Sequence, residues 1–150
     1  MYYLLESSYS KVWDERIVSD NELLEQYSEY ESFCKLKLEI YKNPSDRLEL
    51  HVKGIRENGS KFFISNKGLI KKQSENVFDL IEVGDLVNLD KTLNQVIAIL
   101  KEDKRTIFEI GDNKWFSYKE LNNYLNNNLF AIYKPDANGN YIKVWDKKGE

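Results

Sequence analysis

The stretch CKLKLEIYKNPSDRLELHVKGI (residues 34–55) decides the fold of this chain. Apolar and charged side chains alternate at every second position on both sides of NPSD (43–46), which is the pattern of two half-buried strands. NPSD is a turn sequence, because Asn, Pro, Ser and Asp each favour turn conformations. A second turn, ENGS (57–60), contains Asn-Gly and precedes a short strand, KFFIS. The sequence therefore predicts an antiparallel meander.

Strands and turns continue in the second half of the chain. Residues 77–89 predict the start of a strand with a bend at Gly84-Asp85. Two hairpins are expected after it, one over residues 94–110 and one over residues 129–146. The second of these ends on YIKVWD, which matches YSKVWD (9–14) in five of six letters. Because the two copies stand in different contexts, we interpret them as two strands with Tyr, Lys and Trp on one face, and not as a duplication.

Two helices are expected among these strands, at residues 19–33 and 117–127. Both begin with S-x-x-E, the capping-box pattern in which a Ser side chain and a Glu side chain satisfy the free backbone N–H groups of the first turn. The pairs are Ser19 with Glu22 and Ser117 with Glu120. In the first helix, apolar residues recur at three-to-four spacing and leave the glutamates on a solvent-facing stripe.

These elements predict an α+β fold of mainly antiparallel strands with two helices. Residues 1–75 would hold the first helix and the meander, and residues 76–150 a small β-barrel-like α+β half, the two forming one compact unit. The single Cys34 excludes an internal disulfide, which fits a reducing compartment. The start MYYLLESSYS has no signal-peptide pattern, and no window has the apolar length of a membrane span. We therefore expect a cytoplasmic protein.

Catalytic and metal-binding patterns are missing from the sequence. It contains no P-loop, no G-x-G-x-x-G and no G-x-S-x-G. His51 has no Cys, His or carboxylate at ligand spacing, and Cys34 begins an apolar alternation typical of a core position. We therefore expect a protein that is not an enzyme and that has no metal site and no cofactor.

The charge is unevenly distributed along the chain. Residues 1–32 contain eight acidic side chains and two basic ones, although the net charge of the whole chain is only −3. The segment ELLEQYSEYE (22–31) has four glutamates and no basic residue. Such a segment suits docking on a basic patch of another protein, with Tyr supplying contact area. The predicted partner-binding residues are Glu22, Glu25, Glu29, Tyr30 and Glu31.

Three other interpretations of the sequence stay open. A sponge for a nucleotide signal would need a pocket of aromatic and basic side chains. The candidates for that pocket are Trp13, Arg105, Trp115, Lys143 and Trp145. A nucleic-acid-binding regulator would use basic clusters interleaved with rings, but the pI of 5.4 counts against direct binding. Those clusters are Lys61, Lys67, Lys71 and Lys72 with Phe62 and Phe63, and Lys101, Lys104 and Arg105. Outward Tyr and Trp side chains are equally compatible with a homodimer interface.

The segments NVFDLIEVGDLVNLDKTLNQVIAIL (76–100) and FAIYKPDANGNYIKVWDK (130–147) resemble stretches found in small accessory proteins of phages and prophages of AT-rich, Gram-positive-type bacteria. The resemblance covers residues 76–146 and rests mainly on DLIEVGDLVN. It implies a small β-barrel-like module and a phage protein with an anti-defence role, such as an anti-CRISPR protein. We therefore expect a non-enzymatic inhibitor in the bacterial host cell, whose acidic helix occludes a basic surface of a defence effector.

Overall fold

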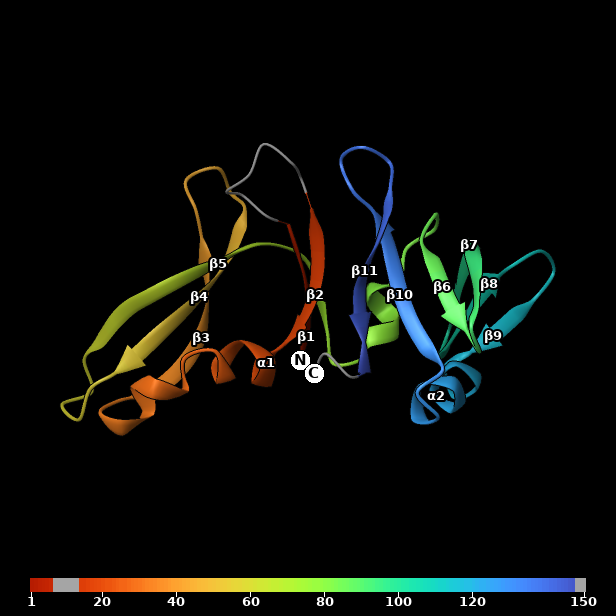
Figure 1. Cartoon of the computed structure of the whole chain (residues 1–150). Helices are drawn as coiled ribbons and strands as arrows, with labels where there is room; N and C mark the ends of the chain where they lie inside the picture. The colour runs from red at the N-terminus through yellow and green to blue at the C-terminus, as the bar shows by residue number, and fades with distance from the viewer. Residues whose placement is uncertain (7–13, 148–150) are drawn as a thin grey trace. The chain divides into compact units, whose positions relative to one another are not determined.

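The computed structural model describes residues 1–6 and 14–147 of the chain. It divides into two compact units, Met1–Glu75 and Asn76–Glu150, and each is described by itself (Figure 1). Both units consist mostly of antiparallel strands, so the α+β class expected from the sequence is confirmed. Among the described residues, no helix has the length and apolar character needed to cross a membrane.

The first unit is a five-stranded antiparallel sheet with the strand order β2-β1-β5-β4-β3. Its strands are β1 (Tyr2–Glu6), β2 (Glu15–Ser19), β3 (Lys35–Lys42), β4 (Leu48–Ile55) and β5 (Lys61–Ser74). The meander predicted from the alternating pattern is therefore confirmed as β3-β4-β5. Strand β5 is much longer than KFFIS, because it pairs with β4 along its first half and with β1 along its second. Register shifts within both pairings mark β-bulges, at which the long strand bends.

The prediction of a single helix over residues 19–33 is wrong, because the segment forms two short helices. These are α1 (Asp20–Glu25) and the 3-10 helix η1 (Ser28–Ser32). Ser19 caps α1 as predicted, and its Oγ accepts a hydrogen bond of 3.2 Å from the Glu22 N–H. The regular helix ends at Glu25, and the side chains of the next two residues, Gln26 and Tyr27, both accept hydrogen bonds from the Lys67 ammonium group on β5. Tertiary contact with the sheet thus overrides the helical pattern.

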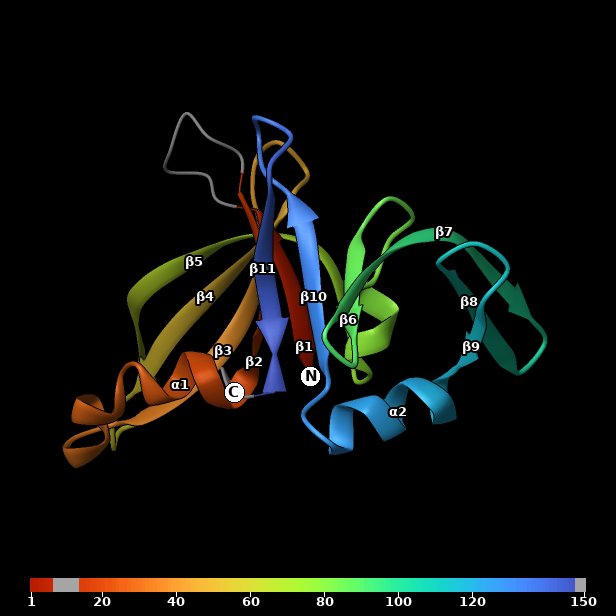
Figure 2. The same ribbon diagram turned by 45° about the vertical axis from the view of Figure 1, so that its right-hand side comes forward.

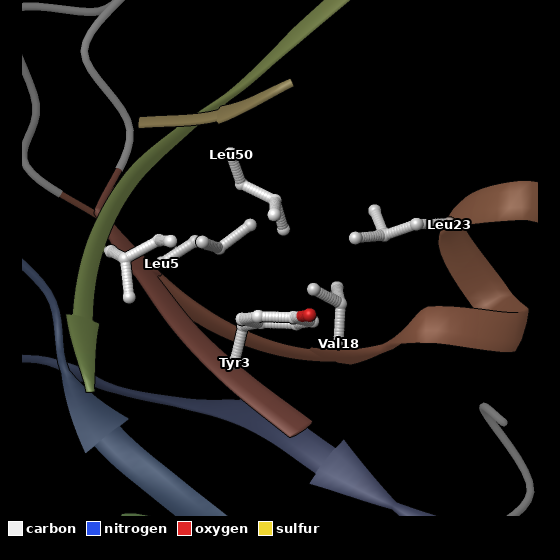
Figure 3. Close-up of a cluster of buried hydrophobic side chains, with 6 residues drawn as sticks. Tyr3, Leu5, Val18, Leu23 and Leu50 are labelled. Carbon is white, nitrogen blue, oxygen red and sulfur yellow. The ribbon is translucent and has the colours of Figure 1, made fainter. Parts of the chain in front are cut away.

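The core of the first unit lies on one face of the sheet. Tyr3, Leu5, Val18 and Leu50 project from the strands toward Leu23 of α1 (Figure 3). Because side chains alternate across a strand, the neighbours of Leu50 along β4 point to the opposite face. That opposite face carries polar and aromatic side chains.

The second unit contains a six-stranded sheet with the order β11-β10-β6-β7-β8-β9. Its strands are β6 (Leu86–Leu89), β7 (Thr92–Glu102), β8 (Arg105–Ile110), β9 (Trp115–Ser117), β10 (Phe130–Pro135) and β11 (Tyr141–Asp146). Both predicted hairpins are confirmed, as β7-β8 and β10-β11. This half was expected to be β-barrel-like, but the described residues form no closed barrel, because β11 and β9 stay at opposite edges of the sheet (Figure 2).

Two helices complete the second unit. The 3-10 helix η2 (Val77–Leu80) replaces the first part of the strand expected over residues 77–89. Its start is fixed by Asn76, whose Oδ1 accepts a 3.0 Å hydrogen bond from the Phe78 N–H. The second helix, α2 (Tyr118–Asn126), has the complete capping box that the sequence predicts between Ser117 and Glu120.

An aromatic chain runs through the core of this unit. The Phe130 ring lies 5.2 Å from that of Phe78 and 6.1 Å from that of Trp145, and Phe78 in turn stacks on Tyr118 of α2. The Tyr118 hydroxyl donates to the Asp79 carboxylate. These contacts connect η2, α2, β10 and β11 into one packed core.

Candidate functional site

The predicted acidic segment forms a surface that we name the acidic-aromatic ridge, consisting of Glu25, Glu29, Tyr30, Glu31 and Phe33. Its three carboxylates are exposed, and none has an ion-pair partner among the described residues. Exposed carboxylates that are not neutralised within their own chain keep their full charge for a partner. The ridge therefore presents a concentrated negative charge to solvent.

Aromatic rings accompany this charge along the same segment. The Tyr30 ring lies 6.2 Å from that of Tyr27 and 5.5 Å from that of Phe33. Phe33 is 61% exposed, which is a high value for a large apolar side chain. A ring that is held by a neighbouring ring and still open to solvent is a typical anchor of a protein interface. The sequence prediction missed Phe33, since its position at the end of the expected helix gave no periodic signal.

The chain segment that carries the ridge is fixed to the sheet through Lys67, which binds Gln26 and Tyr27. The Lys67 ammonium group donates hydrogen bonds of 2.9 Å to Gln26 Oε1 and 3.1 Å to the Tyr27 hydroxyl, and it lies 5.2 Å above the Tyr27 ring. Burial alone would raise the pKa of Tyr27, but hydrogen bonds from Ser65 and Lys67 outweigh it and lower the pKa. The Cys34 thiol donates to the Tyr30 carbonyl. The ridge is therefore held in place by several contacts.

Glu22 differs from the other predicted partner-binding residues. It is half-buried in the first turn of α1, where its backbone N–H is bound to the cap residue Ser19. A negative charge in the first turn stabilises a helix. Glu22 is therefore part of the support of α1, whereas Glu25, Glu29, Tyr30 and Glu31 belong to the surface.

The residues predicted for a nucleotide pocket are not brought together. Trp115 lies on β9 and Arg105 at the start of β8, whereas Lys143 and Trp145 lie on β11 at the other edge of the sheet. Trp145 is only 5% exposed and packs in the core, and Trp13 lies outside the described residues, as does most of YSKVWD. Of the described candidates, only Lys143 lines a hollow. This hollow has a volume of about 190 Å³ and is also lined by Asn88, Lys91 and Lys147. The ammonium group of Lys143 is paired with Asp146 at 2.8 Å, which raises the pKa of Lys143.

His51 and Cys34 do not form a catalytic pair. In the β3-β4 ladder, the residue opposite His51 is Glu39. Cys34 precedes the first residue of β3, Lys35, and is therefore five residues away from that position along the strand. The Nε2 atom of His51 is 2.9 Å from Glu49 Oε1, and the His51 ring is in contact with two other rings. Across the described part of the chain, no group of His, Cys, Asp and Glu has the arrangement of a metal site.

Comparison with known proteins gives no match: no family model, no curated protein and no solved structure is similar enough to count as a relative of this chain.

Proposed function

We propose that this chain is a non-enzymatic binding protein whose acidic-aromatic ridge docks on a basic surface of a partner protein. The observation that carries the proposal is the combination in one segment of three exposed carboxylates, unpaired among the described residues, with the exposed ring of Phe33. The ring supplies an apolar anchor, and the carboxylates supply charge around it. This division into an aromatic centre and a polar rim is that of many protein interfaces.

The energetics of such an interface assign different roles to the two parts. Carboxylates at the rim steer the encounter and make the association rate depend on salt, while they add little to the affinity individually. Burial of Phe33 and Tyr30 would provide most of the affinity, because a ring contributes a large contact area and has few rotatable bonds. We therefore expect loss of the ring to increase the dissociation rate, and reversal of the charges to reduce the association rate.

The more specific proposal is that the partner is a bacterial defence effector and that the ridge covers a surface on which the effector holds nucleic acid. A nucleic-acid channel is basic, so it is the kind of surface that a fixed row of carboxylates complements. The resemblance of residues 76–146 to phage accessory proteins also supports a bacterial defence effector as the partner. The nucleotide-sponge alternative has less support, since those of its proposed pocket residues that the structure describes lie toward opposite ends of one sheet.

To test this proposal, the protein is expressed in bacterial hosts that each carry one defence system. Each host is then plated with a phage that its defence system restricts. We expect plaques to be restored on one host, which identifies the effector. A ridge variant (Glu25→Lys, Glu29→Lys and Glu31→Lys) should lose this effect. A control variant with the same change in net charge (Glu57→Lys, Glu102→Lys and Asp103→Lys) reverses exposed carboxylates in or beside turns elsewhere and should keep it.

Two results would contradict the proposal. One is the failure of the expressed, folded protein to restore plaques on any host. The other is restoration by the ridge variant and the control variant to the same extent, because the effect would then not depend on where the negative charge lies.

A further inference from the structure

A row of three rings lies on the face of the first unit's sheet opposite its core. The ring of His51 on β4 stacks on that of Tyr41 on β3, with 5.1 Å between centroids and 23° between planes. On its other side the Phe63 ring of β5 meets it edge-on at 5.3 Å. His51 is buried, whereas Tyr41 is 48% and Phe63 56% exposed. Two exposed rings thus flank one buried imidazole, and we name these three residues the ring row.

Polar contacts fix the ring row in place. His51 Nε2 lies 2.9 Å from Glu49 Oε1, and the same oxygen accepts a 3.0 Å hydrogen bond from the Asn66 amide. The other oxygen of Glu49 accepts one from the Asn43 amide, also at 3.0 Å. These hydrogen bonds, that of Asn43 first, lower the pKa of Glu49, so its carboxylate is ionised at neutral pH. The rings are therefore preorganised on the sheet.

Three lysines lie beside the ring row on the same face. Lys37 and Lys53 are direct cross-strand partners, and Lys53 in turn faces Phe63 on β5. Lys61 is paired with Glu39 at 2.9 Å. The hydrogen bond from Lys61 and the charges of Lys61, Lys37 and Lys53 lower the pKa of Glu39.

This arrangement is unfavourable for the isolated sheet. Like charges directly opposite each other on neighbouring strands are destabilising, and the two carboxylates named on this face, Glu39 and Glu49, do not balance three ammonium groups. The chain as a whole has a net charge of −3, whereas this face combines three lysines with two exposed rings. An anionic ligand that brings its own aromatic rings would satisfy both features.

We propose that this face binds single-stranded nucleic acid, with bases stacked on Tyr41 and Phe63 and phosphates held by Lys37, Lys53 and Lys61. Single-stranded sites commonly combine stacking rings with a basic surface that follows the backbone. Every base has a flat π-face, so the site would show little sequence preference. The low pI that counts against such binding is an average that includes the ridge, and it does not describe this face. The proposal is independent of the ridge.

The test measures the fluorescence anisotropy of labelled oligothymidylate and oligouridylate with the full chain at low salt. We expect binding of one or both, with a slope of log affinity against log salt of about −2 for three phosphate contacts. Phe63→Leu and Tyr41→Leu keep an apolar side chain beside His51 but remove the stacking ring. Each should weaken binding by about 5-fold to 150-fold. Trp115→Leu, which removes an exposed ring from the other unit, should have no effect.

A second pair of variants tests the charges without touching the rings. Lys37→Ala with Lys53→Ala should flatten the salt slope by about 1.4, whereas Lys101→Ala with Lys104→Ala, two exposed residues at the end of the β7-β8 hairpin, should leave it unchanged. The proposal is overturned if neither oligonucleotide binds at about 100 μM protein, the weak end of non-specific affinities. It is also overturned if the ring variants, with wild-type thermal unfolding, bind as tightly as the wild type.

Discussion

Replacement of Lys134 by methionine is expected to destabilise the second unit strongly. Lys134 lies on β10 and its side chain is 1% exposed. Its ammonium group pairs with Asp85 at 2.7 Å, where the carboxylate is 5% exposed, and with Glu82 at 3.0 Å, where it is 23% exposed. Methionine has nearly the same length and fills the space, so the variant removes the charge and leaves little cavity.

The size of the loss in stability follows from the removal of the ion-pair partner of Asp85. Removing one partner of a buried ion pair costs about 3–5 kcal/mol, because the remaining charge is left in a medium of low polarity. We expect the lower end of this range, since Asp85 Oδ2 still accepts a 2.8 Å hydrogen bond from the Glu82 N–H. A unit comprising half of this chain has a total stability of roughly 4–11 kcal/mol at the usual value per residue. The variant therefore removes a large share of it.

The effect should depend on pH with a defined sign. Burial raises the pKa of Asp85, and the charge and hydrogen bond of Lys134 oppose this rise. Without Lys134 the folded-state pKa must rise further above the unfolded value of about 3.9. A raised carboxyl pKa costs no stability below the unfolded value, and the cost grows as the pH rises through the folded pKa. The deficit of Lys134→Met should thus be largest near neutral pH and shrink in acid.

Urea denaturation followed by tryptophan fluorescence measures this, because Trp115 and Trp145 both lie in the second unit. Adding Asp85→Asn to Lys134→Met removes the stranded charge and should restore most of the lost stability at all pH values. Lys143→Met is the matched control. This variant breaks the ion pair with Asp146, in which the Lys143 side chain is 51% exposed. It should lower the free energy of unfolding by less than about 1 kcal/mol. A loss below about 1 kcal/mol for Lys134→Met, or an equal deficit in acid and at neutral pH, would refute the reasoning.

Three further outcomes are expected from other contacts. Gly54→Ala should destabilise the first unit by about 1–3 kcal/mol in thermal unfolding, since the added Cβ would lie 2.2 Å from the Phe62 ring. Phe62→Leu in the same chain should recover part of that loss, and no recovery would rule out the clash. Ser117→Ala should cost about 1 kcal/mol through loss of the α2 cap, and Ser117→Asp should not; equal losses would exclude capping. The pKa of Glu49 is lowered in the folded state, so Glu49 stabilises the fold above about pH 4.3. This stabilisation is lost as the pH falls through the folded-state pKa. Glu49→Gln should therefore flatten the acid side of the stability profile measured by urea midpoints, and an unchanged profile would count against this role.

The parts of the fold that could be predicted are those with a local cause. The β3-β4 hairpin follows from strict alternation on both sides of an Asx-rich turn, where the Asn43 side chain accepts from the backbone N–H groups of Ser45 and Arg47. Helix α2 follows from its capping box. The length of β5 could not be predicted, because its second half is defined by pairing with β1, a contact between distant residues.

The parts that could not be predicted depend on contacts between distant residues. Val77, Phe78 and Leu80 form a short apolar run that fits a buried strand as well as the buried 3-10 helix that is observed. The acidic residues of the ridge were predictable from composition, but the exposure of Phe33 was not. The ring row required the register of three strands, which places Tyr41, His51 and Phe63 together although they lie ten and twelve residues apart.

The affinity of the purified chain for the effector identified by the plating experiment tests the central claim most directly. It would be measured for the wild type, the ridge variant and the control variant defined above, over a range of salt concentrations. We predict that the ridge variant binds at least tenfold more weakly, a loss of about 1.4 kcal/mol, and that the control stays within about threefold of the wild type. Equal affinities of the ridge variant and the control variant would contradict docking through the ridge.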